Sequence, residues 1–258
     1  MSSILRGATI LRWDSVDAAE AQSGPRALLL APPGDPGRLA DTARILHDLG
    51  FVVRIDVGAP EADMAADVEL VMASAAAGVP SSLMHTWRAR GAVCAVVLPL
   101  GAVPAAGTDA GVATLPAPVT EASLLAMLAG QHYVALSPRE GAGIAGAIAA
   151  QTFGNPAFAR ELLHALVTST RDDLAQLRRA GPDLEAVRGV AHRLKASAHY
   201  VGCHALRLTA QRLEHAARDG DAGMATVLAA IVAPTAARLL ALLASLPPAN
   251  HSDNAPQK

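Results

Sequence analysis

The hydrophobic pattern changes its period near residue 131, and this change strongly limits what the chain can fold into. Before it, short apolar runs alternate with amphipathic stretches, whereas after it apolar residues recur every three or four positions over long segments. Strands alternating with helices predict a doubly wound parallel sheet, and long amphipathic helices with short connections predict a bundle. We therefore expect two domains, an N-terminal α/β domain with a parallel five-stranded sheet and a C-terminal all-α four-helix bundle.

The N-terminal pattern divides into individual strands and helices. Strands are expected at residues 27–31, 51–55, 68–72, 92–98 and 111–115, and helices at 35–48, 81–90 and 120–129. Asp35 precedes Pro36, and both Asp35 and Thr120 are placed to cap helices. Residues 99–110 are rich in Pro, Gly and Ala, so the helix of that connection is expected to be short or absent.

The C-terminal pattern gives four long helices and a set of domain boundaries. The helices are expected at residues 156–180, 183–201, 204–218 and 222–246, with Asp183 as a cap, while Ser137-Pro138 is interpreted as a linker before a short packing helix. The predicted organisation is a tail at 1–24, the α/β domain at 25–131, a linker at 132–138, the bundle at 139–246 and a disordered tail at 247–258.

Composition excludes several classes of protein. A net charge of −2 lacks the basic excess that nucleic-acid binding requires. Cys94 and Cys203 fall in different predicted domains, so neither a disulfide framework nor a metal-binding spacing is present. We find no signal-peptide pattern, and the uncharged run at residues 222–237 is shorter than a membrane span of about 20 residues. These features predict a cytoplasmic protein without direct membrane insertion, and they leave its oligomeric state open.

His192 is the residue with the clearest chemical potential. The predicted helix around it has an apolar stripe, and His192 falls one position off that stripe, on a face shared with Arg188, Lys195, Ala196 and His199. An outward imidazole can attack a phosphoryl group through a neutral ring nitrogen, and a cation one turn away can balance the incoming charge. His192 is therefore the candidate nucleophile, and Lys195 is the candidate stabilising cation.

The residues around His192 continue in an ordered pattern. His192-x-Leu-Lys-small-Ser is followed by Gly202-small-x-x-Leu and then by Leu213-Glu214. Over residues 137–246 this pattern resembles a histidine-containing phosphotransfer (HPt) domain, which implies an antiparallel four-helix bundle with His192 as the phosphoacceptor and Lys195 beside it. Ala196 stands where that family usually has Gly. Arg188, Ala196 and His199 are expected on the docking face, and His199 is the competing candidate for the acceptor.

The N-terminal domain shows a second, less specific resemblance. The order of elements over residues 25–131 and the Pro-containing turn at 115–119 resemble a receiver domain of two-component signalling. Receivers need acidic metal ligands, an Asp phosphoacceptor, a hydroxyl and a Lys at their strand ends. The corresponding positions here are Pro32, Pro33, Ala73, Pro99 and Ala117. We therefore expect a pseudo-receiver that is not phosphorylated and that either binds and positions partners or serves as a spacer.

Together the two resemblances imply an intermediate of a multistep phosphorelay. His192 would accept a phosphoryl group from a phospho-Asp receiver domain of a hybrid histidine kinase and pass it to the receiver of a response regulator. The chain would need no cofactor of its own, since Mg²⁺ would be held by the partner receiver. It lacks the ATP-binding boxes of a kinase core, so no autonomous kinase activity is expected. The alternatives are a non-catalytic docking or sequestering module and the C-terminal part of a hybrid histidine kinase.

Overall fold

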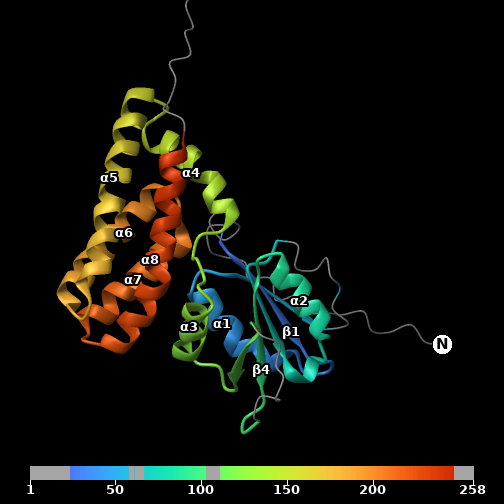
Figure 1. The fold of residues 1–258 in the computed structure, drawn as a ribbon. Coiled ribbons are helices and arrows are strands. Elements are labelled where there is room, and N and C mark those ends of the chain that lie inside the picture. Colours follow the sequence, from blue (N-terminus) through green and yellow to red (C-terminus); the bar gives the residue numbers. More distant parts are fainter. Residues whose placement is uncertain (1–23, 58–60, 62–66, 103–110, 247–258) are drawn as a thin grey trace, which may run out of the picture.

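The computed structural model describes residues 24–57, 61, 67–102 and 111–246 (Figure 1). The predicted tails at residues 1–24 and 247–258 therefore lie outside the described residues, apart from Gly24. Most of the Pro- and Gly-rich segment at 99–110 also lies outside them, so the expected loss of its helix is not tested. The described chain forms two regions, which we call the α/β region (residues 24–131) and the helical region (residues 138–245).

The α/β region is built on a parallel five-stranded sheet, as the sequence predicts. The strand order is β2-β1-β3-β4-β5, and the strands are β1 (Arg26–Ala31), β2 (Val52–Val57), β3 (Leu70–Ser74), β4 (Val93–Leu98) and β5 (Ala113–Pro116). In the register of the sheet, Leu29 pairs with Ile55 on one side and with Met72 on the other. The central strands β1 and β3 are almost continuously apolar because both of their faces are buried.

Helices cover both faces of this sheet. The 3₁₀ helix Pro36–Leu39 leads into α1 (Ala40–Asp48), and α2 (Ser81–Ala89) and α3 (Glu121–Gly130) follow along the chain. Trp87 and Met84 of α2 pack against one face of the sheet, and α3 belongs to the core on the other. Thr120 caps α3 through a capping box, as expected. Asp35 precedes the 3₁₀ helix but its side chain makes no capping hydrogen bond, so its predicted role as a cap was wrong.

The helical region contains α5 (Pro156–Ala180), α6 (Leu184–Tyr200), α7 (His204–Arg218) and α8 (Ala222–Ser245). Helix α5 packs against α6 and α8, and α7 packs against the same two helices (Figure 1). Asp183 caps α6 by accepting a hydrogen bond from the backbone N–H of Ala186 at 3.0 Å, as expected. Gly202 lies in the connection between α6 and α7 and has a φ of 71°, a conformation that favours glycine.

The segment before α5 differs from the sequence expectation. Ser137 and Pro138 do not form a loose linker but begin α4 (Pro138–Gln151), a helix of 14 residues. Ser137 and Glu140 form a capping box, and Pro occupies the first helical position, where its missing N–H removes no hydrogen bond. Helix α4 contacts α5, α6 and α8 and therefore belongs to the packed structure.

Helix α8 is the most apolar element. Among the described helices it is the one that is long and apolar enough to cross a membrane by length and composition, with a mean hydropathy of 2.1. The uncharged run counted in the sequence ends at Ala237, whereas the helix continues through Arg238 to Ser245. Leu228, Ile231 and Leu239 of α8 are buried against α3, α5 and α7, and 39% of the apolar window of this helix is buried.

The two regions share a continuous apolar core. Helix α3 packs on α8, and Tyr133 in the connection stacks on Phe51 with ring centroids 5.5 Å apart (Figure 1). The backbone N–H of Ala135 donates to Thr235 Oγ1 on α8 at 2.9 Å, inside the core. The predicted linker at 132–138 is therefore buried for most of its length, and it holds the regions in contact.

Candidate functional site

Helix α6 presents His192 to solvent because its opposite face is fully used in packing. The buried residues of this helix lie at helical spacing on one stripe, which is formed by Val187, Val190, Ala191, Leu194, Ser197 and Ala198. His192 lies beside this stripe, and its side chain is 65% exposed. The sequence prediction of an accessible imidazole on the outer face of the helix is thus matched in the structure.

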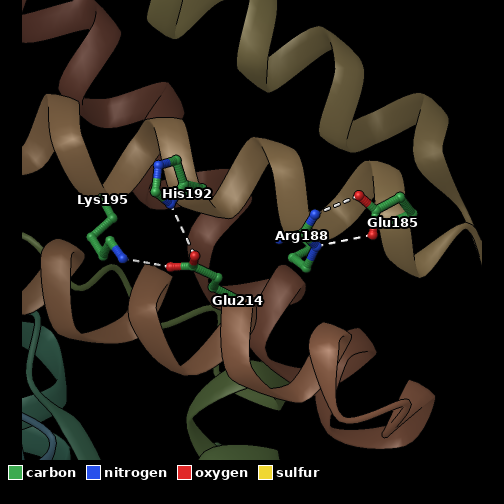
Figure 2. A network of polar contacts seen from close by, with 5 residues as sticks. All are labelled: Glu185, Arg188, His192, Lys195 and Glu214. Atoms are coloured by element: carbon green, nitrogen blue, oxygen red, sulfur yellow. Dashed lines mark hydrogen bonds and ion pairs between the residues drawn. The ribbon is translucent and has the colours of Figure 1, made fainter.

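Glu214 of α7 holds both predicted reactive side chains. Its Oε1 lies 2.9 Å from Nδ1 of His192, and its Oε2 accepts a hydrogen bond from Nζ of Lys195 at 2.6 Å (Figure 2). Each carboxylate oxygen therefore serves one partner, and the three side chains form a bridge between α6 and α7. Because the Glu214 side chain is only 15% exposed, this bridge is set partly into the groove between the helices.

The electrostatics of the bridge determine which ring nitrogen of His192 is available. The ammonium of Lys195 hydrogen bonds to Glu214 and is the main cause that lowers the pKa of this carboxyl below its ordinary value, against the opposing effect of burial. Near neutral pH Glu214 is therefore an anion and can only accept hydrogen bonds. In the neutral ring Nδ1 must then carry the proton, which leaves Nε2 with its lone pair. Within the described part of the chain Nε2 has no hydrogen-bond partner.

The other residues predicted on this face have separate surroundings. Arg188 is turned toward Glu185, with Nε and one terminal nitrogen 2.9 and 2.6 Å from its carboxylate oxygens (Figure 2). Ala196 is exposed one turn after His192. His199 is also exposed, but its ring lies against Tyr200, with centroids 6.1 Å apart, and not against Glu214. The structure thus brings Lys195 to His192 through Glu214, and it leaves Arg188 and His199 outside this bridge.

Arg193, next to His192, joins α6 to α5 through polar contacts. Nε of Arg193 donates to Oδ1 of Asp173 on α5 at 2.6 Å, and a terminal nitrogen donates to Oε1 of Gln176 at the same distance. Asp173 is almost fully buried, and burial raises its pKa despite the opposing effect of Arg193. This contact joins α5 to α6 at the residue next to His192, so it restricts rotation of the helix that carries the imidazole.

Glu214 is the candidate site residue whose contacts the sequence did not reveal. It belongs to the quoted Leu213-Glu214 pair, but it lies 22 residues after His192, and no helical spacing connects the two. The contact exists because α7 packs along α6 in one particular register. The signal in the sequence was a charged residue next to the apolar stripe of α7. That charge alone does not identify the residue with which it pairs.

At the carboxyl edge of the sheet, the five positions that correspond to the phosphorylation site of a receiver hold proline or alanine. Pro32 and Pro33 follow β1, Ala73 is buried in β3, Pro99 follows β4 and Ala117 follows β5. Across the described residues, no group of three or more His, Cys, Asp or Glu side chains could hold a metal ion. The reactive groups that the structure brings together are therefore those on α6 and α7.

Comparison with known proteins agrees with this location. Residues 161–246 match the family model described as "Hpt domain", a range that includes most of α5 and all of α6, α7 and α8. No curated protein and no solved structure matched the chain. The α/β region fits a receiver-like fold through its sheet order alone. This match supports an Hpt domain at residues 161–246, and with it a phosphohistidine carrier of two-component phosphorelays.

Proposed function

We propose that His192 is the phosphoacceptor of this Hpt domain and that the chain relays a phosphoryl group between two receiver domains. The observation that carries the proposal is the contact of Nδ1 with Glu214, at 2.9 Å, on an imidazole whose side chain is 65% exposed. This contact selects the tautomer in which Nε2 is the nucleophile, and the exposure gives a partner access to it.

The proposed transfer conserves atoms and charge without a further reactant. The lone pair of Nε2 attacks the phosphorus of a partner's aspartyl phosphate, and a new N–P bond forms. The P–O bond to the aspartyl carboxylate breaks, and its electron pair returns to that carboxylate. The Nδ1 proton stays on the ring, so the phosphoimidazole gains positive charge next to the Glu214 anion. Transfer to the second receiver is the same displacement in reverse.

Glu214 and Lys195 have different roles in this proposal. Glu214 is a positioning residue, because it orients the ring and stabilises the charge that the ring acquires. Lys195 ends 2.6 Å from Glu214, on the same side of α6 as the imidazole, where it can interact with the phosphoryl oxygens after transfer. A divalent cation, where one is needed, would belong to the partner receiver.

The fold of the bundle and of the α/β region supports further parts of the proposal. The mutual contacts of α5, α6, α7 and α8 support the antiparallel four-helix bundle implied by the Hpt resemblance. We infer that the α/β region is a pseudo-receiver, because the phosphorylation positions hold Pro or Ala. Its buried contacts with the bundle favour a positioning role over that of a spacer. The proposed setting is the cytoplasm, and the proposed partners are receiver domains.

Phosphotransfer from radiolabelled receivers tests the proposal directly. The full chain should acquire acid-labile label, and His192→Gln should abolish it. His199→Gln is the matched control, since it removes an exposed imidazole two turns along the same helix face, and it should leave the label unchanged. Label that persists in His192→Gln but disappears in His199→Gln would contradict the assignment. Stoichiometric binding without transfer from any receiver would instead support a non-catalytic docking module.

A further inference from the structure

The first turn of α7 contacts the α/β region directly. Gly50 lies between α1 and β2, has a φ of 88° and contacts α7 so closely that an added Cβ would lie 2.8 Å from Leu208 Cδ1 and 3.6 Å from His204 Cδ2. We call residues 47–51, which are the last two residues of α1 and the three that follow it, the α1–β2 turn. The left-handed backbone at Gly50 favours glycine, and a side chain there would have to displace the tip of Leu208. The α1–β2 turn is therefore a fixed neighbour of the first turn of α7.

His204 connects this turn to the outer face of the two helices. Its Nδ1 lies 3.1 Å from a terminal nitrogen of Arg207, and Arg207 is seven residues before Glu214 on the same face of α7. On α6 the same direction leads from His192 through Ala196 to His199 and Tyr200, all of which are exposed. Exposed side chains on α6 and half-buried side chains on α7 thus lie between the imidazole and the part of α7 that contacts the α/β region. In Figure 2 the ribbon of the α/β region appears on the Lys195 side of the bridge.

The usual size of a protein–protein interface indicates whether a partner bound at His192 would reach the first turn of α7. A standard interface buries about 800 Å² on each partner, which corresponds to a disc of about 16 Å radius. From Glu214 back to His204 is ten residues of α7, or about 15 Å at about 1.5 Å per residue. Measured along α7, a partner centred on His192 therefore reaches the first turn of this helix, which the α1–β2 turn contacts.

Arg207 is the cation on this surface that fits an acidic partner. Glu214 is occupied by Lys195 and His192, and Arg207 has no carboxylate partner among the described residues. Tyr200, 46% exposed, adds an aromatic side chain of the kind that often carries binding energy at interfaces. A receiver whose phosphorylation pocket is lined with carboxylates complements such a surface.

We propose that a receiver docked on His192 contacts the α1–β2 turn at the same time, so that the α/β region contributes part of the docking surface. The composite surface consists of the exposed face of α6 from His192 to Tyr200, Arg207 of α7 and the α1–β2 turn. This inference rests on the proposed function. It gives the α/β region a role in partner selection that requires no phosphorylation of its own.

Photocrosslinking to the full chain tests the composite surface. The photoreactive residue p-benzoylphenylalanine replaces Asp48 in the turn or, as a matched control, Asp41 at the other end of α1. Both are exposed and both pair with Arg44 at 3.9 Å, so the two substitutions remove equivalent contacts. Replacement at Ala196 is the positive control. A purified receiver that exchanges phosphate with the chain should crosslink at positions 196 and 48 and not at 41.

Transfer kinetics give a second, independent readout. Tyr200→Ala should raise the KM for the phosphorylated receiver about tenfold, with little change in kcat, because it removes contact area and no reacting group. Phe158→Ala removes another exposed aromatic side chain, on α5 and outside the composite surface, and should leave both constants unchanged.

The outcomes separate this inference from the proposed function. Transfer to His192 with crosslinking at 196 alone, or with equal crosslinking at 48 and 41, would overturn the composite surface and leave the phosphotransfer role intact. Equal effects of Tyr200→Ala and Phe158→Ala on KM would also overturn it. If no receiver transfers phosphate to the wild-type chain, the proposed function fails and the composite surface fails with it.

Discussion

Thr235→Val tests how firmly the helical region is tied to the connection from the α/β region. Thr235 is fully buried on α8, and its hydroxyl accepts the only hydrogen bond that the described structure gives to the backbone N–H of Ala135, at 2.9 Å. The same hydroxyl donates to the carbonyl of Ile231 at 2.7 Å. Valine has nearly the same shape, so the substitution removes these bonds and leaves the packing in place.

The expected loss of stability follows from the buried amide. A buried donor left without an acceptor costs about 1–3 kcal/mol, and burying a methyl group in place of the hydroxyl returns about 0.8 kcal/mol. We expect a net loss of about 0.2–2 kcal/mol in the free energy of unfolding. For a chain of this length that corresponds to a fall in Tm of about 2–4 °C for each kcal/mol.

The assay compares Thr235→Val with Thr226→Val by thermal unfolding and amide hydrogen exchange. Thr226 lies on the same helix and donates to the carbonyl of Ala222 at 2.8 Å, the same local bond, but it is exposed. Its replacement should change stability by no more than about 0.5 kcal/mol. The Ala135 amide should exchange faster only in Thr235→Val. Equal Tm shifts in the two variants, or unchanged exchange at Ala135, would refute the reasoning.

Three further predictions concern the site and its supports. Glu214→Ala should slow transfer to His192 about tenfold, and Glu214→Gln should recover part of the rate because its amide oxygen can still accept from Nδ1. Equal rates in the two variants would contradict the positioning role. ¹⁵N NMR of the imidazole reports the tautomer. Ala196→Leu should raise the KM for a receiver without unfolding the domain, as circular dichroism can verify, since the added bulk lies on the exposed docking face; an unchanged KM would place docking elsewhere. Burial raises the pKa of Glu140 above its ordinary value of 4.5, so its favourable effect on folding is complete below that value and is lost as pH rises through the raised pKa. Glu140→Gln should therefore destabilise the protein more at pH 4.5 than at pH 7 in urea unfolding, and the opposite trend would disprove this.

Local periodicity and capping signals were sufficient to place most elements. The approximate bounds predicted for α5 and α7 agree with the structure, because Asn155-Pro156 starts one helix and Gly202 precedes the other. The failures occurred where a local signal had two readings. Ser137-Pro138 fits either a linker or a helix start, and Asp35 precedes a proline without using its side chain as a cap.

The sequence by itself determined that His192 is exposed on a helix with Lys195 one turn away, since both facts follow from the helical period. Tertiary structure alone decided that Glu214 joins them, because its distance from His192 depends on the register in which α7 packs on α6. It also decided that Gly50 lies against α7, through a contact between residues more than 150 positions apart. Helical spacing relates only residues within a few turns, whereas contacts between helices arise from the packing of whole apolar faces, and a single sequence does not specify that register.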